Sequence, residues 1–498
     1  MPNENTMQIL VVTGRKAAET VNAVVGGIAD VLVLDIDVAA FTTPSRLKNS
    51  MPHDNFDLII IPGLVSADFS HLEKQLNTPI RLGPKNAVDL GLVLSSIEDI
   101  ELSTTVPACE MLNIKRKEAA TSGLLEMEAA ATYAFLLRDL KIGGCSIMKV
   151  MGEVVDATSL SGDELFERVV LFQSSGADII DLGVGMAAAV AEVEHVITTA
   201  RMAASVPLSI DTLDPQLIMA ALDFGVDMVL SLNSTNIEVA GPAIASKGLA
   251  AVVIPDSGQG LDSLVVNIAL ARELGISRIL ADPVLDPPGQ GMVGSMVRYT
   301  RCRELLPDIP MFFGAGNITE LMDADTVGVN ALLAAIGHDV GADVLFTPEY
   351  SDKARGSISE LKTAAQMMTL AAQRSSPPKD VGIDLLMLKE KRFRPFDVMP
   401  GEFIEAEDSY QWTRDPAGSF SINISRSLVK NGVVEKGRII ARHTKYTIVG
   451  DKAKEIMDTA IELGLVSRLD HAAYLGKELM RAELALNLGR SYAQDDAF

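Results

Sequence analysis

A regular alternation of short apolar runs and helical patterns fills the middle of the chain, from about residue 145 to residue 375. Continuous Val, Ile and Leu runs are typical of parallel strands that are buried on both faces. The predicted strands are residues 146–151, 178–183, 207–211, 227–233, 250–256, 278–282, 311–314 and 343–347. Eight such units in about 230 residues predict a (β/α)8 (TIM) barrel, because a doubly wound sheet rarely needs eight evenly spaced units.

Polar side chains follow each predicted barrel strand, where the functional groups of this fold lie. Asp and Asn also cap helices, so capping explains any one of these residues taken alone. The recurrence of Asp, Asn and Asp at one depth on the third, fourth and sixth strands instead indicates a ring of hydrogen-bond acceptors. In strand order, the polar residues are Glu153 with Asp156, Asp181, Asp211, Asn233, Asp256, Asp282, Asn317 and Glu349.

A pterin is a ligand that such a ring would hold. Its 2-amino group and ring N–H groups form a donor edge, from which carboxylates accept hydrogen bonds in bidentate fashion. An Asn side chain serves the mixed donor and acceptor edge of the same ring system. The sequence therefore predicts a pterin site at the mouth of the barrel.

The sections on either side of the barrel have different patterns. Residues 1–125 contain three Val/Ile/Leu runs and predict an open, flavodoxin-like α/β domain. The stretch 373–380 is rich in Ser, Pro and Lys and is predicted to be a linker. Residues 381–498 contain two β-like runs followed by two helical patterns, so we predict an α+β accessory domain after a barrel at 140–375.

Composition excludes several classes of function. The chain has 66 acidic and 43 basic residues and a net charge of −23, which argues against binding to nucleic acid or to an anionic membrane. It contains no apolar stretch of the roughly 20 residues that cross a bilayer and no signal-peptide pattern at its start. Three cysteines without disulfide or zinc spacing, and six histidines without metal-ligand spacing, favour a cytoplasmic protein.

Several segments resemble the pterin-binding superfamily, which includes dihydropteroate synthases and pterin-dependent methyltransferases. They are MGEVVDA (151–157), GADIIDLGVG (176–185), LSIDTLDPQLIMAALDFGVDMVLSLNSTNIE (208–238), ILADPVLDPPGQG (279–291) and MFFGAGNITEL (311–321). The resemblance implies that Asp211, Asn233 and Asp282 contact the pterin. It also aligns Asp156 with an Asn of the family and places Asn317 at the seventh-strand position.

The whole chain is similar to three-domain, dihydropteroate synthase-related proteins of organisms that make tetrahydromethanopterin. The opening VTGRKAAETV and the closing LDHAAYLGKELMRAELAL carry this wider match. The chain departs from the synthases where GVGMAAA and GAGNIT replace motifs that bring Ser, Thr, Arg and Lys. In the synthases, those groups serve the diphosphate and the aminobenzoate. At the first and seventh strands, the segments GEVVD and GNIT resemble the methyltransferase branch more than the synthases.

The reaction that the resemblance implies is condensation of a dihydropterin-6-methyl diphosphate with an arylamine, in particular ribofuranosylaminobenzene 5'-phosphate. In that reaction Glu153, Asp156 and Asp211 are the expected catalytic residues, and Asp156 would bind Mg²⁺. Lys353 and Arg355, after the eighth strand, would bind phosphate. The alternatives are a tetrahydropterin-dependent methyltransferase and a non-catalytic pterin-binding subunit, and the expected assembly is a homodimer.

Overall fold

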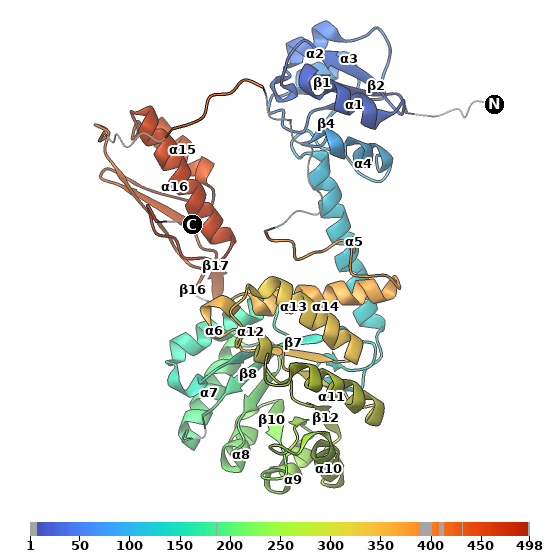
Figure 1. Ribbon diagram of the computed structural model, residues 1–498, viewed down its shortest axis with the longest axis vertical. Helices are drawn as coiled ribbons and strands as arrows, with labels where there is room; N and C mark the ends of the chain where they lie inside the picture. Colours follow the sequence, from blue (N-terminus) through green and yellow to red (C-terminus); the bar gives the residue numbers. More distant parts are fainter. Residues whose placement is uncertain (1–6, 186, 389–400, 408–412, 431, 497–498) are drawn as a thin grey trace, which may run out of the picture. The chain divides into compact units, whose positions relative to one another are not determined.

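The computed structural model of the chain describes residues 7–185, 187–388, 401–407, 413–430 and 432–496. These residues form two compact units. The first contains residues 7–125 together with 380–383, and the second contains residues 126–379 and the described residues from 384 onward. Figure 1 colours both units by sequence position. The three predicted domain boundaries stay a prediction.

The second unit contains a ring of parallel strands in the order β12-β11-β10-β9-β8-β7-β14-β13. An isolated parallel bridge between Ala281 and Met311 joins the two edge strands. The strands are β7 (Lys149–Val154), β8 (Ile179–Gly183), β9 (Leu208–Asp211), β10 (Met228–Leu232), β11 (Ala250–Val253), β12 (Arg278–Ala281), β13 (Phe312–Phe313) and β14 (Val344–Thr347). This architecture confirms the predicted TIM barrel and the mixed α/β class.

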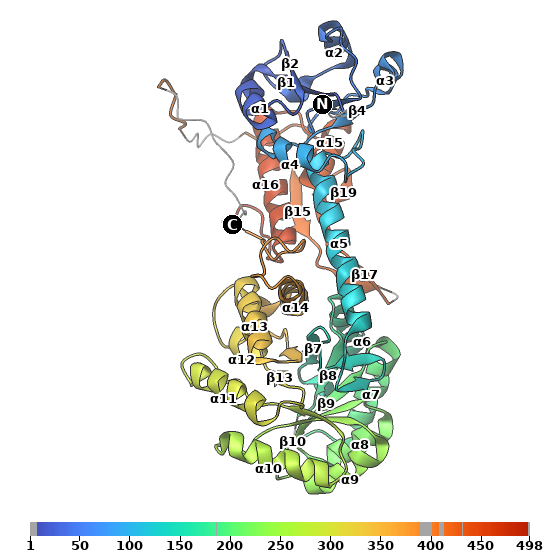
Figure 2. The same ribbon diagram turned by 90° about the vertical axis from the view of Figure 1, so that its right-hand side faces the viewer.

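Helices surround the ring, as Figures 1 and 2 show. They are α6 (Gly162–Ser174), α7 (Val190–Ala203), α8 (Pro215–Phe224), α9 (Ile237–Lys247), α10 (Gly260–Glu273), α11 (Met292–Leu305), α12 (Gly316–Thr319), α13 (Thr326–Val340) and α14 (Ser357–Gln373). Local sequence sets their ends. Ser161 and Glu164 form a capping box at the start of α6, and α8 ends at Gly225 in the left-handed conformation, as its sequence predicts.

The first barrel strand lies three residues later than predicted, at 149–154 instead of 146–151. Residues before it belong to a turn, in which the Ser146 hydroxyl donates to the carbonyls of Lys141 and Gly143. The other seven strands all lie within their predicted ranges. The correction places Glu153 inside the strand rather than in the loop after it.

A short hairpin covers the amino-terminal end of the barrel and was not predicted. It consists of β5 (Phe135–Leu137) and β6 (Leu140–Ile142). Its Phe135, Leu137 and Ile142 belong to the apolar cluster that fills the inside of the ring. Since this end is closed by packed side chains, a ligand would enter at the carboxyl end of the strands.

The first unit is a four-stranded parallel sheet in the order β2-β1-β3-β4. This order is that of a flavodoxin-like sheet and agrees with the open, flavodoxin-like α/β domain predicted for this section. Its strands are β1 (Ile9–Gly14), β2 (Asp30–Leu34), β3 (Leu58–Ile61) and β4 (Ile80–Leu82), and its helices are α1 (Ala18–Val25), α2 (Pro44–Ser50), α3 (Ser70–Leu76) and α4 (Leu90–Ser95). The long helix α5 (Ala108–Ala130) follows and was not predicted.

The last section has α+β architecture, as predicted. An antiparallel sheet in the order β15-β18-β19 packs with two helices around one apolar cluster. The elements are β15 (Phe420–Ile424), β16 (Leu428–Lys430), β17 (Val433–Glu435), β18 (Ile439–His443), β19 (Thr447–Gly450), α15 (Ala453–Glu462) and α16 (Leu469–Asn487). The β16–β17 hairpin was not predicted. Among the described residues, none of the helices is both long and apolar enough to span a membrane.

Candidate functional site at the carboxyl end of the barrel

Strand register explains why the acids of the first three barrel strands face the barrel axis. Met151 and Ile179 belong to the inner apolar cluster, and side chains two residues apart on a strand share a face. Glu153 and Asp181 therefore also point inward, and they lie side by side in the register of β7 and β8. Asp211 ends β9, next to Gly183 of β8.

These three acids form a compact cluster. One carboxylate oxygen from each of Glu153, Asp181 and Asp211 lies within 4.8 Å of the others. Gly183 makes room for the Glu153 carboxylate, because a Cβ atom at this position would lie 2.6 Å from Glu153 Oε1. Asp181 is fully buried, and its Oδ1 accepts a hydrogen bond from the Ser209 hydroxyl, whereas its Oδ2 has no partner among the described residues. An unpaired buried carboxylate oxygen calls for a proton or a ligand.

Burial and like charges raise the pKa values of the cluster. Burial raises the pKa of Glu153 to about 8, with further contributions from Asp211 and Asp156. The pKa of Asp181 is also raised, by burial first and then by Asp211 and Glu153. Burial and the charge of Asp282 raise the pKa of Asp211 to about 6. The cluster therefore holds at least one proton at neutral pH.

Asp282, after β12, is held by two donors. Its Oδ1 accepts hydrogen bonds from the Val284 N–H and the Tyr299 hydroxyl, both at 2.8 Å. Tyr299 is fully buried and packs against Phe313, with 5.1 Å between the ring centroids. Because the position of its hydroxyl is fixed, the hydrogen bond also fixes the orientation of the Asp282 carboxylate. Burial raises the pKa of Asp282 to about 6. Sequence reasoning gave no role to Tyr299.

Asn233, after β10, is buried and presents a donor. Its Oδ1 accepts hydrogen bonds from the N–H of Thr235 at 2.9 Å and from the Thr235 hydroxyl at 2.6 Å. Both bonds use the oxygen, which leaves the Nδ2 group to donate. Asn236 anchors the same loop, because its Oδ1 accepts the Asn233 N–H at 3.0 Å.

The other predicted pterin and metal residues lie outside the cluster. Asp156 is exposed, with a positive φ of 48° at the turn after β7. Asp256 Oδ1 accepts the Ser234 N–H at 3.1 Å, a hydrogen bond that lowers the pKa of this acid. Asn317 is exposed and donates to the Leu285 carbonyl at 2.9 Å. The assignment of these three residues to a ligand stays a prediction.

Both cations predicted to bind phosphate have acidic partners from this chain. Lys353 Nζ lies 2.8 Å from Asp323 Oδ1 and also donates to the Met322 carbonyl at 2.9 Å. Arg355 pairs with Asp352 Oδ1 at 2.7 Å. A bound phosphate would compete with these carboxylates.

Among the predicted residues, the structure brings Glu153 and Asp211 together, and the charge of Asp282 acts on Asp211. It adds Asp181, which the sequence placed in the ring of acceptors but to which no binding or catalytic role was assigned. The signal in the sequence is an acid inside the apolar run IIDL, two residues after the inward-facing Ile179.

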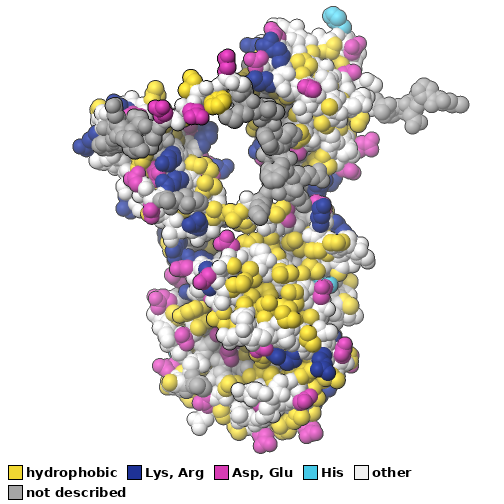
Figure 3. Space-filling model, viewed as in Figure 1, with side chains coloured by type: hydrophobic (Ala, Val, Ile, Leu, Met, Phe, Trp, Pro, Cys, Tyr) yellow, Lys and Arg dark blue, Asp and Glu magenta, His cyan; other side chains and the backbone are white. Residues whose placement is uncertain are grey.

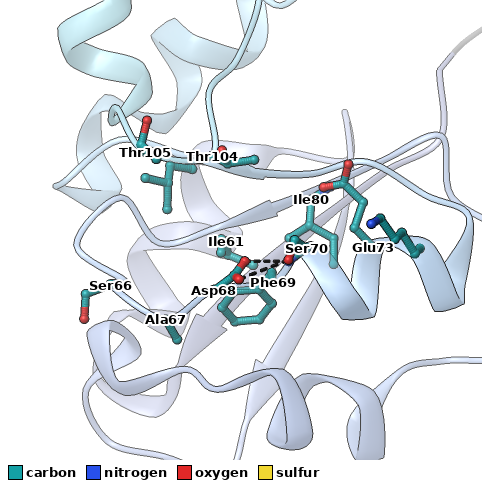
Figure 4. A pocket seen from close by; sticks show the side chains of 12 residues that line it. Ile61, Ser66, Ala67, Asp68, Phe69, Ser70, Glu73, Ile80, Thr104 and Thr105 are labelled. Atoms are coloured by element: carbon teal, nitrogen blue, oxygen red, sulfur yellow. Dashed lines mark hydrogen bonds between the residues drawn. The ribbon is translucent and has the colours of Figure 1, made fainter.

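The first unit contains a separate hollow of about 320 Å³ where β3 and β4 end. Figure 4 shows Asp68 and Ser70 on its wall, joined by hydrogen bonds. The Asp68 carboxylate accepts the Ser70 N–H at 2.8 Å and the Ser70 hydroxyl at 3.0 Å. Asp68 and Ser70 thus make these hydrogen bonds with each other, so we assign no ligand to the hollow. Likewise, Arg15 in the turn after β1 pairs with Asp35 and Asp37.

Comparisons with known proteins agree with the site chemistry. A family model described as "Pterin binding enzyme" matches residues 155–261, which carry Asp181, Asp211 and Asn233. A second family model, "PterinBD-DUF4346", matches residues 414–495. A TIM barrel with inward-facing acids and this match defines a pterin-binding barrel protein.

A more specific relationship covers the full chain. The uncharacterized protein MJ0107 of Methanocaldococcus jannaschii is 36% identical over 98% of this chain and 98% of its own length. The chain therefore belongs to the same family, a family of dihydropteroate synthase-related, pterin-binding proteins. A Ycf91-like protein of a Nostoc species is 44% identical over 12% of this chain and 55% of its own length.

Solved dihydropteroate synthases are also similar in part. The Yersinia pestis enzyme with a pterine-sulfa conjugate has 19% identity and a TM-score of 0.39, over 48% of this chain and 98% of its own. The Xanthomonas albilineans enzyme with 4-aminobenzoic acid has 22% identity and a TM-score of 0.39, over 47% and 95%. These values are low, so the fold assignment rests on the strand order itself.

Proposed function

We propose that the protein is an enzyme that binds a reduced pterin at the carboxyl end of its barrel. In this proposal Asp211 and Asp282 accept hydrogen bonds from the donor edge of the pterin, and Asn233 donates to it. Membership of a pterin-binding family supports the ligand class. The raised pKa values of the two Asp residues support the same proposal, because donors from a ligand would stabilise their ionised forms.

The reaction we propose is transfer of a methyl group from N5 of a tetrahydropterin to a nucleophile. The observation that carries this proposal is Glu153, a partly buried acid that lies in one cluster with Asp211 and whose pKa of about 8 keeps it protonated at neutral pH. When the N5–CH₃ bond breaks, its electron pair stays on N5 and the methyl group goes to the nucleophile. N5 then needs a proton, which we assign to the Glu153 carboxyl group.

The second candidate is condensation of a dihydropterin-6-methyl diphosphate with an arylamine phosphate, as in tetrahydromethanopterin synthesis. Lys353 and Arg355 favour it by following β14, where many barrels bind phosphate. Their ion pairs with Asp323 and Asp352 weigh against it.

The condensation would require a cation such as Mg²⁺ to neutralise the diphosphate. Carboxylate oxygens are the ligands that Mg²⁺ prefers, and those of Glu153, Asp181 and Asp211 lie close enough to one another to share an ion. Asp156, the residue that the sequence suggested, would contribute only from the exposed turn after β7.

Calorimetry and a product assay separate the two reactions. The full chain would be titrated with a tetrahydropterin, and separately with a dihydropterin-methyl diphosphate with and without Mg²⁺. For methyl transfer we expect tetrahydropterin binding without Mg²⁺, its loss in Asp282→Asn, and no diphosphate release on addition of arylamine. Diphosphate release that requires the amine would establish the condensation instead. Absence of binding by either pterin would reject the pterin site.

Three further predictions accompany the proposal. A non-catalytic pterin-binding subunit would bind the pterin with the same Asp282 dependence but turn over neither substrate.

A homodimer would use an exposed apolar face. Figure 3 shows hydrophobic side chains gathered over α13 and its neighbours. In this part of the chain Leu321 and Leu332 are 65% and 61% exposed. Light scattering of wild type and Leu332→Glu tests that assembly. Cytoplasmic location stays a prediction.

A further inference from the structure

An acid stands in the loop after β14 at the place where barrels of this architecture bind phosphate. In many (β/α)8 enzymes, the phosphate contacts loops after the seventh and eighth strands and the free N–H groups at a helix N-terminus. Here α14, a helix of 17 residues, follows β14 and begins at Ser357. The first N–H groups of α14 are the donors that a phosphate would need.

Glu349 already uses those donors. Its Oε1 accepts the Gly356 N–H at 2.8 Å, and its Oε2 accepts the Ile358 N–H at 3.0 Å. The carboxylate thus spans the helix N-terminus with both oxygens, as two oxygens of a phosphate would. The backbone of Glu349 has a φ of +44°, a conformation that a residue other than glycine seldom adopts.

The cationic groups of the same loop are matched by acids as well. Lys353 pairs with Asp323, and Arg355 pairs with Asp352. This observation is independent of the helix terminus, because these contacts involve side chains on both partners. A carboxylate of this chain thus lies beside Lys353, Arg355 and the N–H groups of Gly356 and Ile358, all of which would attract a phosphate near α14.

We propose that Glu349 is an internal substitute for phosphate and makes the barrel reject ligands that carry a phosphate at this position. An incoming phosphate must either displace a carboxylate that makes two charge-assisted hydrogen bonds or remain beside its negative charge. Glu349 is then a specificity-determining residue. The inference deepens the proposed function by stating that the second substrate carries no phosphate near α14, and it stands whether or not a pterin binds.

Inorganic phosphate and diphosphate are the probes that test this role. We would measure their binding to the full chain by calorimetry and by ³¹P NMR line broadening, for wild type, Glu349→Ala and Glu349→Gln. We expect no saturable phosphate binding by wild type, and at least about a tenfold gain in affinity for Glu349→Ala. Glu349→Gln should gain less, because its amide still fills the space and accepts one N–H. Asp163→Asn, an exposed acid in the first turn of α6, is the control for net charge.

A stability measurement keeps the test decisive if Glu349→Ala folds poorly. The alanine variant loses two hydrogen bonds at the start of α14, so its melting temperature should fall, and added phosphate should restore it by taking the same place. Wild type should show no such rescue. Saturable phosphate binding by wild type with unchanged affinity in Glu349→Ala would overturn the inference, as would folded alanine and glutamine variants that gain nothing. Pterin binding is measured separately, so its failure would leave these outcomes unaffected.

Discussion

The two ends of the barrel bury acidic side chains in opposite ways. At the amino-terminal end, each partly buried acid has a cationic partner within ordinary ion-pair distance. The pairs are Lys149 with Glu128 at 2.9 Å, Lys362 with Asp178 at 2.7 Å, Arg201 with Asp227 at 3.0 Å and Arg303 with Asp343 at 3.2 Å. At the carboxyl end, the charges that shift Glu153, Asp181 and Asp211 come from other acids.

The amino-terminal acids also repeat one structural device. Asp178, Asp227 and Asp343 each stand immediately before a strand. Each accepts an N–H, at 2.8 or 2.9 Å, from a residue in the neighbouring strand or directly before it. Their cations complete the charge balance, so these residues fasten the strands. By contrast, the charges that act on Glu153, Asp181 and Asp211 are all negative, so ionising these acids costs stability unless a ligand supplies donors.

The largest expected effect comes from Asp211→Asn at the carboxyl end. The substitution keeps the shape of the side chain but removes the charge that would accept hydrogen bonds from the pterin. We expect a loss of affinity of roughly 100-fold or more together with an unchanged or higher melting temperature. Calorimetry and thermal unfolding of the same preparation measure both. A fall in stability with unchanged pterin affinity would contradict the view that acids at the carboxyl end serve ligand binding and acids at the amino-terminal end stabilise the fold.

Asp227→Asn at the amino end should show the reverse behaviour. It removes the negative charge that pairs with Arg201 and Arg138 and, among the described residues, leaves these two cations with backbone carbonyl acceptors only. We expect the free energy of unfolding to fall by roughly 1–3 kcal/mol, with pterin affinity unchanged. Denaturant unfolding measures the loss. A loss of pterin affinity in the folded variant would show that this end contributes to the site.

The pH dependence of stability tests the proton on Glu153. Its pKa is raised from 4.5 to about 8, so the folded protein binds more protons than the unfolded chain between these values. Stability contributed by this group is therefore present below pH 4.5 and is lost as pH rises through 8. We expect Glu153→Gln to be more stable than wild type at pH 8, by roughly 1–3 kcal/mol, and to differ little at pH 5. Equal pH profiles would show that Glu153 is ionised at neutral pH.

The smallest expected effect is that of Asp156→Asn on Glu153. Asp156 is one of the like charges that raise the pKa of Glu153, so its removal should lower the midpoint of the Glu153 titration by roughly half to one pH unit. ¹³C NMR of the glutamate side chains would follow that titration, with Asp163→Asn, an exposed acid of α6, as a control for net charge. An unchanged midpoint would mean that the charge of Asp156 does not act on Glu153.

Part of the site could be predicted because strand periodicity is local. Apolar runs ending in Asp or Asn gave Asp211, Asn233 and Asp282 at the correct end of the barrel, and seven strands lie within their predicted ranges. The first strand was misplaced because Gly152 and Glu153 indicate a loop by residue type, whereas pairing with Ile180 and Asp181 of β8 keeps both of them in the strand. No local pattern reports such a partner.

The sequence by itself determined the class of fold, the end of the barrel that carries the acids and the family resemblance, since all three depend on residue type and spacing. Only the tertiary structure decided which acids share one cluster and which cations are already paired. Asp181 joined Glu153 through strand register, whereas Lys353 met Asp323 through a contact between two loops 30 residues apart in the chain. The physical reason is that the ionisation and pairing of a charged side chain depend on the groups that lie near it in space. Those groups come from strands and loops that are far apart in the sequence.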